Sequence, residues 1–287
     1  MKPDVIDLYN EYIHGDLPRR TFLKRLAGIA GGAAAASALL PLLESNYAWG
    51  QQVPEDDPRL ETGYVEYAGS MGVVRAYYAR PADHSGPLPG VLVIHENRGL
   101  NAHIEDVARR TGLAGYLALA PDGLTFAGGA PVDQEAARDL FGQSDRARIT
   151  DDVIAGVPYL AGRPDCTGRV GAVGFCYGGG VALLCAARES AVAAAVCFYG
   201  SPLGAEDVAR VKVPLMMHYA GKDERINQSI PAFRKLLDDS AVAYSLNMYP
   251  GTNHGFHNDS SEARYDAGAA GLAWKRTLAF FEACLAT

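Results

Sequence analysis

Apolar residues come in short continuous runs from about residue 61 onward, and amphipathic stretches separate these runs. Continuous apolar runs of strand length indicate strands buried on both faces, whereas apolar residues recurring every three or four positions indicate helices that cover a sheet. The expected strands lie at residues 91–95, 116–120, 170–175, 194–199, 214–219 and 244–249. The expected helices lie at residues 104–114, 151–160, 179–188, 230–238 and 268–285. This alternation predicts an α/β fold with a mostly parallel central sheet and helices on both faces.

Two earlier apolar runs, at residues 65–67 and 74–78, follow each other with no helix between them. We therefore expect an antiparallel hairpin at one edge of the sheet. No linker-like stretch interrupts the pattern after residue 60, so residues 51–287 are expected to form one domain.

The first fifty residues have a different character. The pair Arg19-Arg20 precedes an apolar run at 26–43 that is rich in alanine and glycine, which is typical of a twin-arginine export signal. The run is short for a membrane span, so no stable span is expected. Small residues at Ala48 and Gly50 suit cleavage before Gln51, which predicts a periplasmic protein. The alternative is a cytoplasmic protein with an uncleaved helical amino terminus, because apolar residues between 5 and 13 recur at helical spacing.

Composition narrows the class of protein. Apolar residues make up 48% of the chain and charged residues 21%, and the formal net charge is −7. This balance is that of a soluble protein with a sizeable core, and it argues against nucleic acid as a partner. The five cysteines form no C-x-x-C pair, so no metal site is expected. Cys185 and Cys197 fall in apolar runs and are expected to be buried.

One segment carries the most chemical information. The expected strand at 170–175 runs into Gly174-Phe175-Cys176-Tyr177-Gly178, and a helix follows. A nucleophile on so sharp a strand-to-helix turn needs small neighbours, and this arrangement is typical of a nucleophile elbow with cysteine in the serine position. The N-terminal end of the helix favours the thiolate. Cys176 is therefore the expected nucleophile.

Two later segments supply the partners that a nucleophile of this kind needs. Asp223 lies in the turn after the expected strand at 214–219, and His254 lies in the loop after the strand at 244–249. The order nucleophile, acid, histidine is that of α/β-hydrolases. We expect His254 to exchange a proton with Cys176 and Asp223 to orient His254.

These segments together resemble the dienelactone hydrolase family, whose members are carboxymethylenebutenolidase-like enzymes of the α/β-hydrolase superfamily. The resemblance covers roughly residues 60–285 and includes a fourth motif, from His95 to Asn101. It implies that Glu96 contacts the resting thiol and gates its ionisation. It also implies that the backbone N–H groups of Asn97 and Tyr177 form the oxyanion hole.

The chain departs from the family pattern at one point. The resemblance implies arginines that hold a substrate carboxylate, one of them shortly after the histidine, yet residues 254–258 contain no arginine. The match to the other arginine falls around residues 134–138. Arg98, beside Glu96, is a candidate to take over this role.

The sequence thus predicts a hydrolase that cleaves an ester or a lactone through a covalent acyl-cysteine, with no metal or organic cofactor. Its partner is a small-molecule substrate. Two other functions remain open: a non-catalytic binding protein on a hydrolase scaffold, and a thiol sensor that uses Cys176.

Overall fold

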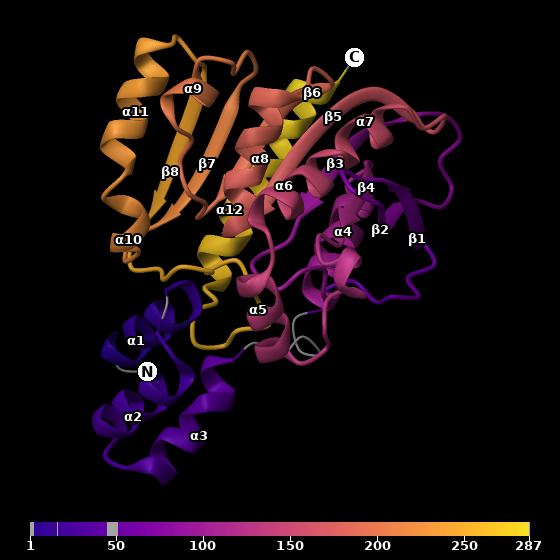
Figure 1. Ribbon diagram of the computed structural model, residues 1–287. Coiled ribbons are helices and arrows are strands. Elements are labelled where there is room, and N and C mark those ends of the chain that lie inside the picture. The colour runs from indigo at the N-terminus through magenta and orange to yellow at the C-terminus, as the bar shows by residue number, and fades with distance from the viewer. Residues whose placement is uncertain (1–2, 16, 45–50, 287) are drawn as a thin grey trace.

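A sheet of eight strands runs through the computed structural model, which describes residues 3–15, 17–44 and 51–286 (Figure 1). The order of its strands is β1-β2-β4-β3-β5-β6-β7-β8. The strands are β1 (Leu60–Ala68), β2 (Val73–Pro81), β3 (Leu88–Ile94), β4 (Leu117–Pro121), β5 (Cys166–Phe175), β6 (Val192–Phe198), β7 (Leu215–Ala220) and β8 (Tyr244–Tyr249).

The sheet is parallel except at one edge. β1 pairs with β2 antiparallel, and β2 pairs antiparallel with β4, while all later pairs are parallel. The expected hairpin is therefore confirmed, and so is the mostly parallel sheet. Because the parallel strands all end at one edge, the loops that follow β3, β5, β6, β7 and β8 meet there.

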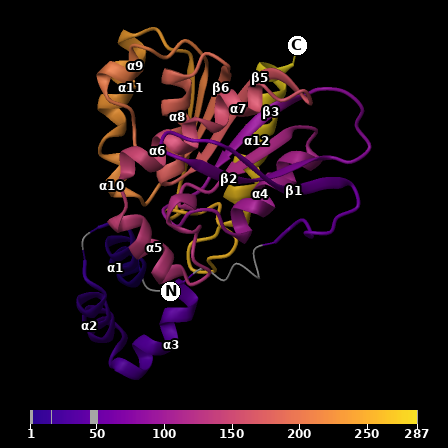
Figure 2. The same ribbon diagram turned by 45° about the vertical axis from the view of Figure 1, so that its right-hand side comes forward.

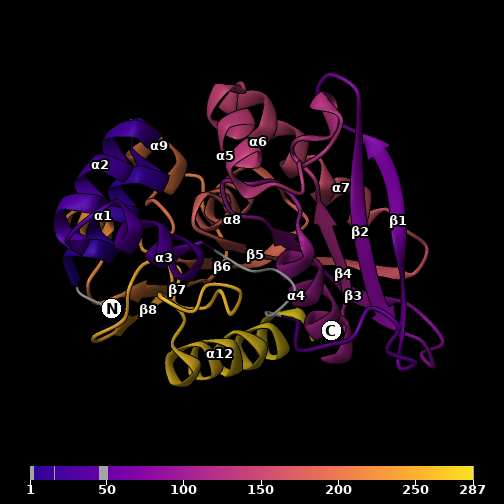
Figure 3. The same ribbon diagram turned by 90° about the horizontal axis from the view of Figure 1, so that it is seen from below.

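Helices cover both faces of the sheet (Figure 3). α4 (Ala102–Leu113) and α12 (Ala267–Leu285) contribute to the core on one face. The core of the other face includes described residues of seven helices. These are α5 (Gln134–Gln143), α6 (Arg146–Ile154), α7 (Gly156–Ala161), α8 (Tyr177–Arg188), α9 (Ala205–Val208), α10 (Glu224–Asn227) and α11 (Ile230–Asp239). The α/β-hydrolase fold predicted from the alternating pattern is thus confirmed.

The central strands show why their sequences are continuously apolar. Val91, Leu92, Val93 and Ile94 of β3 are all fully buried, because consecutive side chains point to opposite faces and both faces are covered. A strand with one face in water would need alternating polar residues. Continuous burial therefore fixes β3 as an inner strand, and its carboxyl end delivers the loop that begins at His95.

Two expectations about helices need correction. The stretch 151–160, expected as one helix, belongs to two, since α6 ends at Ile154 and α7 begins at Gly156. No helix was expected at α5 (Gln134–Gln143), although the capping residue Asp133 precedes it. Short elements η1 (Thr125–Ala127) and α10 (Glu224–Asn227) were likewise not expected.

Three helices precede the sheet, namely α1 (Pro3–His14), α2 (Arg19–Ala30) and α3 (Ala33–Leu43). They lie beside α5 and α10, at the end of the molecule where the parallel strands finish (Figures 1 and 2). They share a small apolar core, in which the rings of Tyr12 and Phe22 stack with centroids 4.3 Å apart. The apolar positions between residues 5 and 13 fill this core.

Specific contacts tie these helices to the rest of the chain. Asn97 donates from Nδ2 to the carbonyl of Ile13 at 2.9 Å. The hydroxyl of Tyr12 donates to Glu135 at 3.1 Å, and the guanidinium of Arg138 lies 3.9 Å from the centre of the Tyr12 ring. An ion pair joins Arg19 to Glu135. The end of α1 is therefore held against α5 and against the loop after β3.

Within the described ranges, no single helix is long and apolar enough to cross a membrane. α2 and α3 together meet the length and composition criteria, but they are bent by 110° relative to each other. The cleavage position expected before Gln51 falls beside residues 45–50, which lie outside the described residues.

Candidate active site

Cys176 lies at the junction of β5 and α8, at the edge of the sheet where the parallel strands end. Its backbone has φ of 54° and ψ of −114°, a conformation that residues with a side chain rarely adopt. Such strain persists only where the surrounding structure imposes it, and it is characteristic of a nucleophile elbow.

The glycines around Cys176 make this turn possible. A Cβ on Gly174 would lie 1.9 Å from the carbonyl oxygen of Gly178. A Cβ on Gly178 would lie 2.5 Å from the carbonyl oxygens of Ile94 and His95. Both positions thus exclude any side chain, which is the requirement inferred from the sequence. The close approach to His95 also brings the elbow against the loop that follows β3.

Asp223 and His254 reach the same edge from β7 and β8. Nδ1 of His254 donates a hydrogen bond of 2.5 Å to Oδ2 of Asp223, and both side chains are buried. Burial alone would raise the pKa of Asp223, but the hydrogen bond and the charge of His254 outweigh it and lower that pKa. Asp223 is therefore ionised and fixes the orientation of the imidazole.

The Cys176 sulfur lies close to His254 and to a residue that the sequence did not indicate. Sγ of Cys176, a ring nitrogen of His254 and a ring nitrogen of His14 all lie within 4.8 Å of one another. Burial disfavours the charged form of His254, but the nearby Cys176 and the hydrogen bond to Asp223 raise its pKa to about 9. This arrangement suits proton exchange between Cys176 and His254.

His14 is the last residue of α1 and comes from far away in the sequence. Its Nδ1 lies 3.8 Å from Sγ of Cys176, and its ring meets the ring of His254 at a centroid distance of 4.3 Å. Burial, followed by the charges of His254 and Arg225, lowers the pKa of His14 well below its usual value. His14 is therefore neutral beside the sulfur. No local motif marks it, because only tertiary packing brings α1 to this place.

Glu96 follows β3 and is buried close to the same cluster. Its Oε2 accepts a hydrogen bond of 2.8 Å from Asn258, and the hydroxyl of Tyr199 lies 3.5 Å from its Oε1. Burial works against ionisation, but the charges of Arg264, His103 and Arg98 lower the pKa of Glu96. Asn258, which the sequence did not single out, therefore helps to hold an ionised Glu96.

Asn97 and Tyr177 line the same cavity as Cys176 and come from two different segments. Tyr177 is the first residue of α8, where a backbone N–H has no partner within the helix, and Asn97 lies in the loop after β3. These are the two residues whose backbone N–H groups the family resemblance implies for an oxyanion hole. Arg98 is buried, and its guanidinium donates to Oδ1 of Asn97 at 3.0 Å. The Arg98 guanidinium thus contacts Asn97, and Arg98 does not line the cavity that opens beside Cys176.

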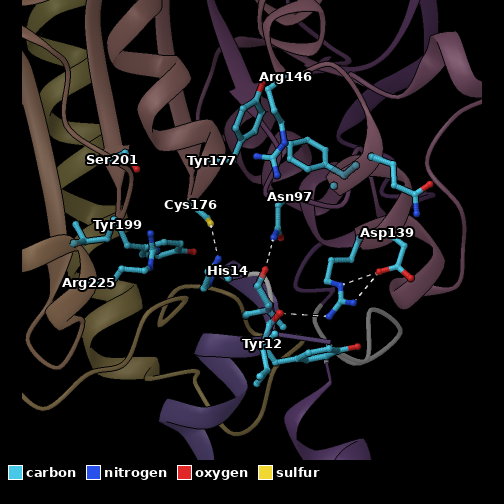
Figure 4. A pocket seen from close by; sticks show the side chains of 18 residues that line it. Tyr12, His14, Asn97, Asp139, Arg146, Cys176, Tyr177, Tyr199, Ser201 and Arg225 are labelled. Carbon is cyan, nitrogen blue, oxygen red and sulfur yellow. Dashed lines mark hydrogen bonds and ion pairs between the residues drawn. The ribbon is translucent and has the colours of Figure 1, made fainter. Parts of the chain in front are cut away.

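A cavity of about 450 Å³ opens beside Cys176 (Figure 4). Its wall includes Asn97, Tyr177 and three arginines. The arginines are Arg138, Arg146 and Arg225. One acidic residue, Asp139, also lines the cavity, and it forms an ion pair with Arg138. The cavity therefore carries excess positive charge, supplied by α5, α6 and α10 and not by the segment after His254.

His14, Cys176 and His254 are also close enough to share a metal ion, and no other group of the described histidines, cysteines and carboxylates is. The hydrogen bond from His254 to Asp223 and the strained backbone of Cys176 are also what a nucleophile with a histidine partner would need. Cys185 and Cys197 are fully buried, as expected, and lie in the core.

The model of the dienelactone hydrolase family matches residues 74–285. The chain belongs to the dienelactone hydrolase family. A second model, described as YqhI-like, matches residues 1–32, which include α1. The resemblance stated from the motifs is confirmed, and with it an enzyme that hydrolyses carboxylic ester or lactone bonds.

Relatives within the family span most of the chain. A putative carboxymethylenebutenolidase of Escherichia coli strain K12 is 32% identical over 80% of this chain and 89% of its own length. A probable 2-oxo-3-(5-oxofuran-2-ylidene)propanoate lactonase of Bradyrhizobium is 36% identical over 74% of this chain and 90% of its own. The crystal structure of a putative dienelactone hydrolase from Klebsiella pneumoniae is similar, with a TM-score of 0.69 and 28% identity. It covers 77% of this chain, and 98% of that chain is matched.

Proposed function

We propose that this enzyme hydrolyses esters or lactones that carry a carboxylate, through an acyl group held on Cys176. The observation that carries the proposal is the position of the strained Cys176. It lies within 4.8 Å of His254, which Asp223 orients, and it faces a cavity lined by three arginines.

In the first step, Sγ of Cys176 attacks the carbonyl carbon of the substrate as a thiolate. The carbonyl oxygen becomes an oxyanion that the N–H groups of Asn97 and Tyr177 stabilise. The carbon–oxygen bond to the leaving group then breaks, and His254 gives its proton to the departing alkoxide. In a lactone the leaving group stays attached to the acyl chain.

In the second step, water attacks the thioester, and His254 takes up a proton from that water. The bond between Sγ and the carbonyl carbon breaks, which releases the acid and restores the thiolate. Asp223 holds the imidazole in the same orientation throughout. Glu96 accepts a hydrogen bond from Asn258 and lies close to Tyr199. Its negative charge influences the ionisation of the Cys176 thiol.

The charge of the cavity supports a carboxylate-bearing substrate. Guanidinium groups bind carboxylates through charge-assisted hydrogen bonds, and Arg146 and Arg225 approach the cavity from different helices. The name of the Bradyrhizobium relative, a lactonase for a substituted propanoate, describes a substrate of this class. We expect an ester with a carboxylate to be turned over with a higher kcat/KM than a neutral ester of equal size.

The test is replacement of the proposed nucleophile. Cys176→Ala should lower the turnover of an aryl ester by orders of magnitude, because deleting a nucleophile removes the covalent route. Cys284→Ala, which removes a half-buried thiol of α12 away from the cavity, is the matched control and should keep its activity. More than about a tenth of wild-type turnover in Cys176→Ala would refute the assignment. Absence of turnover in the wild type would instead favour a binding or thiol-sensing role.

A further inference from the structure

A second cavity, of about 730 Å³, lies on the other side of the end of α1. It is bounded by α1, by the turn after β7 and by the loop after β8. His14, Gly15 and Arg225 line both cavities, so the end of α1 forms the partition between them. A volume of this size is within the range of small-molecule sites.

The two cavities meet different atoms of the reaction. Cys176 and the expected oxyanion hole line the first cavity, whereas Asp223 and His254 line the second. Nε2 of His254 is buried and has no hydrogen-bond partner among the described residues. This nitrogen carries the proton that the leaving oxygen needs. The alcohol half of a substrate should therefore lie on the side of His254, and the acyl half on the side of Cys176.

The two cavities also differ in the charge of their walls, which bears on the acyl half and the alcohol half of a substrate. The first has three arginines and one aspartate in its wall. The second has four carboxylates, which belong to Asp7, Glu11, Asp223 and Glu224. Three cations balance them in its wall, namely Lys222, Arg225 and the protonated His254, and Glu11 is also paired with Arg25. The second cavity therefore lacks the excess positive charge that favours a carboxylate in the first, which suits an uncharged alcohol.

The second cavity also offers polar atoms that lack partners. Oδ1 of Asn10 and Nε2 of His14 are both buried without a hydrogen bond in the described part of the chain. Both residues come from α1 and line this cavity. Buried polar atoms are normally satisfied, so these two are free to bind hydroxyl groups of a ligand.

We propose that the second cavity binds the alcohol half of an ester substrate, and that this alcohol is uncharged and carries hydroxyl groups. Asn10 and His14 recognise the hydroxyls, and His14 separates the alcohol half from the acyl half. This proposal rests on the proposed function, since it takes His254 as the donor to the leaving oxygen. When the carbon–oxygen bond breaks, the proton moves from Nε2 of His254 to the alkoxide, and the alcohol departs through the second cavity.

The experiment compares two esters of one acid on the full-length chain, the monomethyl and the monoglyceryl ester of glutaric acid. Wild-type enzyme should show a higher kcat/KM for the glyceryl ester. Asn10→Ala should lower the ratio of kcat/KM for the glyceryl over the methyl ester about threefold to tenfold, as expected for one lost hydrogen bond. Asn10→Trp, which fills the cavity, should lower the ratio at least as far.

Gln143→Ala is the matched control, because it removes another amide side chain, but from the first cavity. It faces the acyl half that both esters share, so the ratio should stay within about twofold of wild type. An equal ratio in wild type, Asn10→Ala and Asn10→Trp would overturn the proposal. A fall of the ratio in Gln143→Ala as large as that in Asn10→Ala would overturn it too.

Binding measurements separate this proposal from the proposed function. Calorimetry on Cys176→Ala should give a Kd for the glyceryl ester that rises about threefold to tenfold when Asn10→Ala is added. Equal affinities, or no binding to either variant, would overturn the alcohol site even if wild-type enzyme were inactive on both esters. Conversely, methyl ester turnover that survives Cys176→Ala would refute the proposed nucleophile and leave the comparison of the Asn10 variants valid.

Discussion

At the scale of single residues, His254 is subject to opposing influences on its proton. Burial removes the ring from water, which disfavours the imidazolium, while Cys176 and Asp223 favour it. The favourable contributions are larger, and the pKa rises to about 9. His254 therefore keeps its proton at neutral pH. A group that protonates a leaving alkoxide must carry a proton, so this state suits the proposed role.

This balance predicts the alkaline limb of the activity profile. Because His254 is protonated below a pKa of about 9, kcat/KM should fall as pH rises through that value. Asp223→Asn removes a charge and a hydrogen bond that raise this pKa, so the limb should move to lower pH. The same change should lower kcat about 10²- to 10⁴-fold. The pH profile of kcat/KM, together with an NMR titration of the His254 ring, measures both effects, and an unmoved limb in Asp223→Asn would contradict them.

At the scale of elements, the junction of β5 and α8 depends on backbone atoms that approach unusually closely. The glycine at position 178 lies against the carbonyls of Ile94 and His95, which belong to β3 and the loop that follows it. These are backbone atoms, so they cannot turn aside as a flexible side chain would. The proposed nucleophile and the expected oxyanion hole are therefore positioned by the same contact.

Gly178→Ala should consequently destabilise the protein by about 1–3 kcal/mol, because the new methyl group has no room. Activity should fall as well, since the loop after β3 must move. Gly271→Ala is the matched control: this glycine lies on the exposed side of α12 with nothing within 4 Å of the added Cβ. It should stabilise the protein by about 0.5–1 kcal/mol. Urea unfolding measures both, and equal free energies of unfolding in the two variants would contradict the steric argument.

The amino-terminal helices act at the same scale, because α1 supplies the wall between the two cavities. α1 is amphipathic, and its apolar residues pack on α2 and α3. Its end is held by Asn97, which donates to the carbonyl of Ile13. A helix whose local pattern is that of a surface element thus becomes part of the site through long-range contacts, of which this hydrogen bond is one.

At the scale of the whole molecule, α1 contributes residues to the site, and the export prediction concerns the same amino-terminal segment. Export through the twin-arginine route remains a prediction from Arg19-Arg20, and cleavage before Gln51 would remove Asn10 and His14 with α1. The alcohol site requires these residues in the working enzyme. The alcohol site therefore requires a mature enzyme that keeps α1, whereas export with cleavage predicts a mature enzyme without it.

We expect active enzyme from the native host to retain α1, with an intact mass near the full 30.5 kDa. The reason is the set of contacts that α1 makes with Cys176, His254 and Asn97. Mass spectrometry of the purified active fraction provides the measurement, and a chain beginning near Gln51 would contradict retention. Replacing Arg19 and Arg20 by lysine tests export separately, because an exported enzyme should then stay in the cytoplasm.

The alternating apolar and amphipathic stretches were enough to predict the α/β layers and to predict which residues lie at the carboxyl edge of the sheet. Strands such as β3 are apolar throughout because they are buried on both faces, and a residue that follows such a strand must lie at its carboxyl end. Cys176, Asp223 and His254 could be placed on these grounds, since each follows a strand of its own. The glycines beside Cys176 added the turn, because only glycine fits there.

Only the tertiary structure decided what surrounds these three residues. His14 and Asn10 lie on a helix far from Cys176 in the sequence, and Arg146 and Arg225 lie on helices whose orientation no local pattern specifies. Burial and periodicity report which side of a helix faces a core, but not which end meets a distant loop. That meeting depends on long-range packing, on contacts such as the hydrogen bond from Asn97 to Ile13. The residues that follow the strands, Cys176, Asp223 and His254, could therefore be predicted from the sequence. The residues that line the two cavities around them could not.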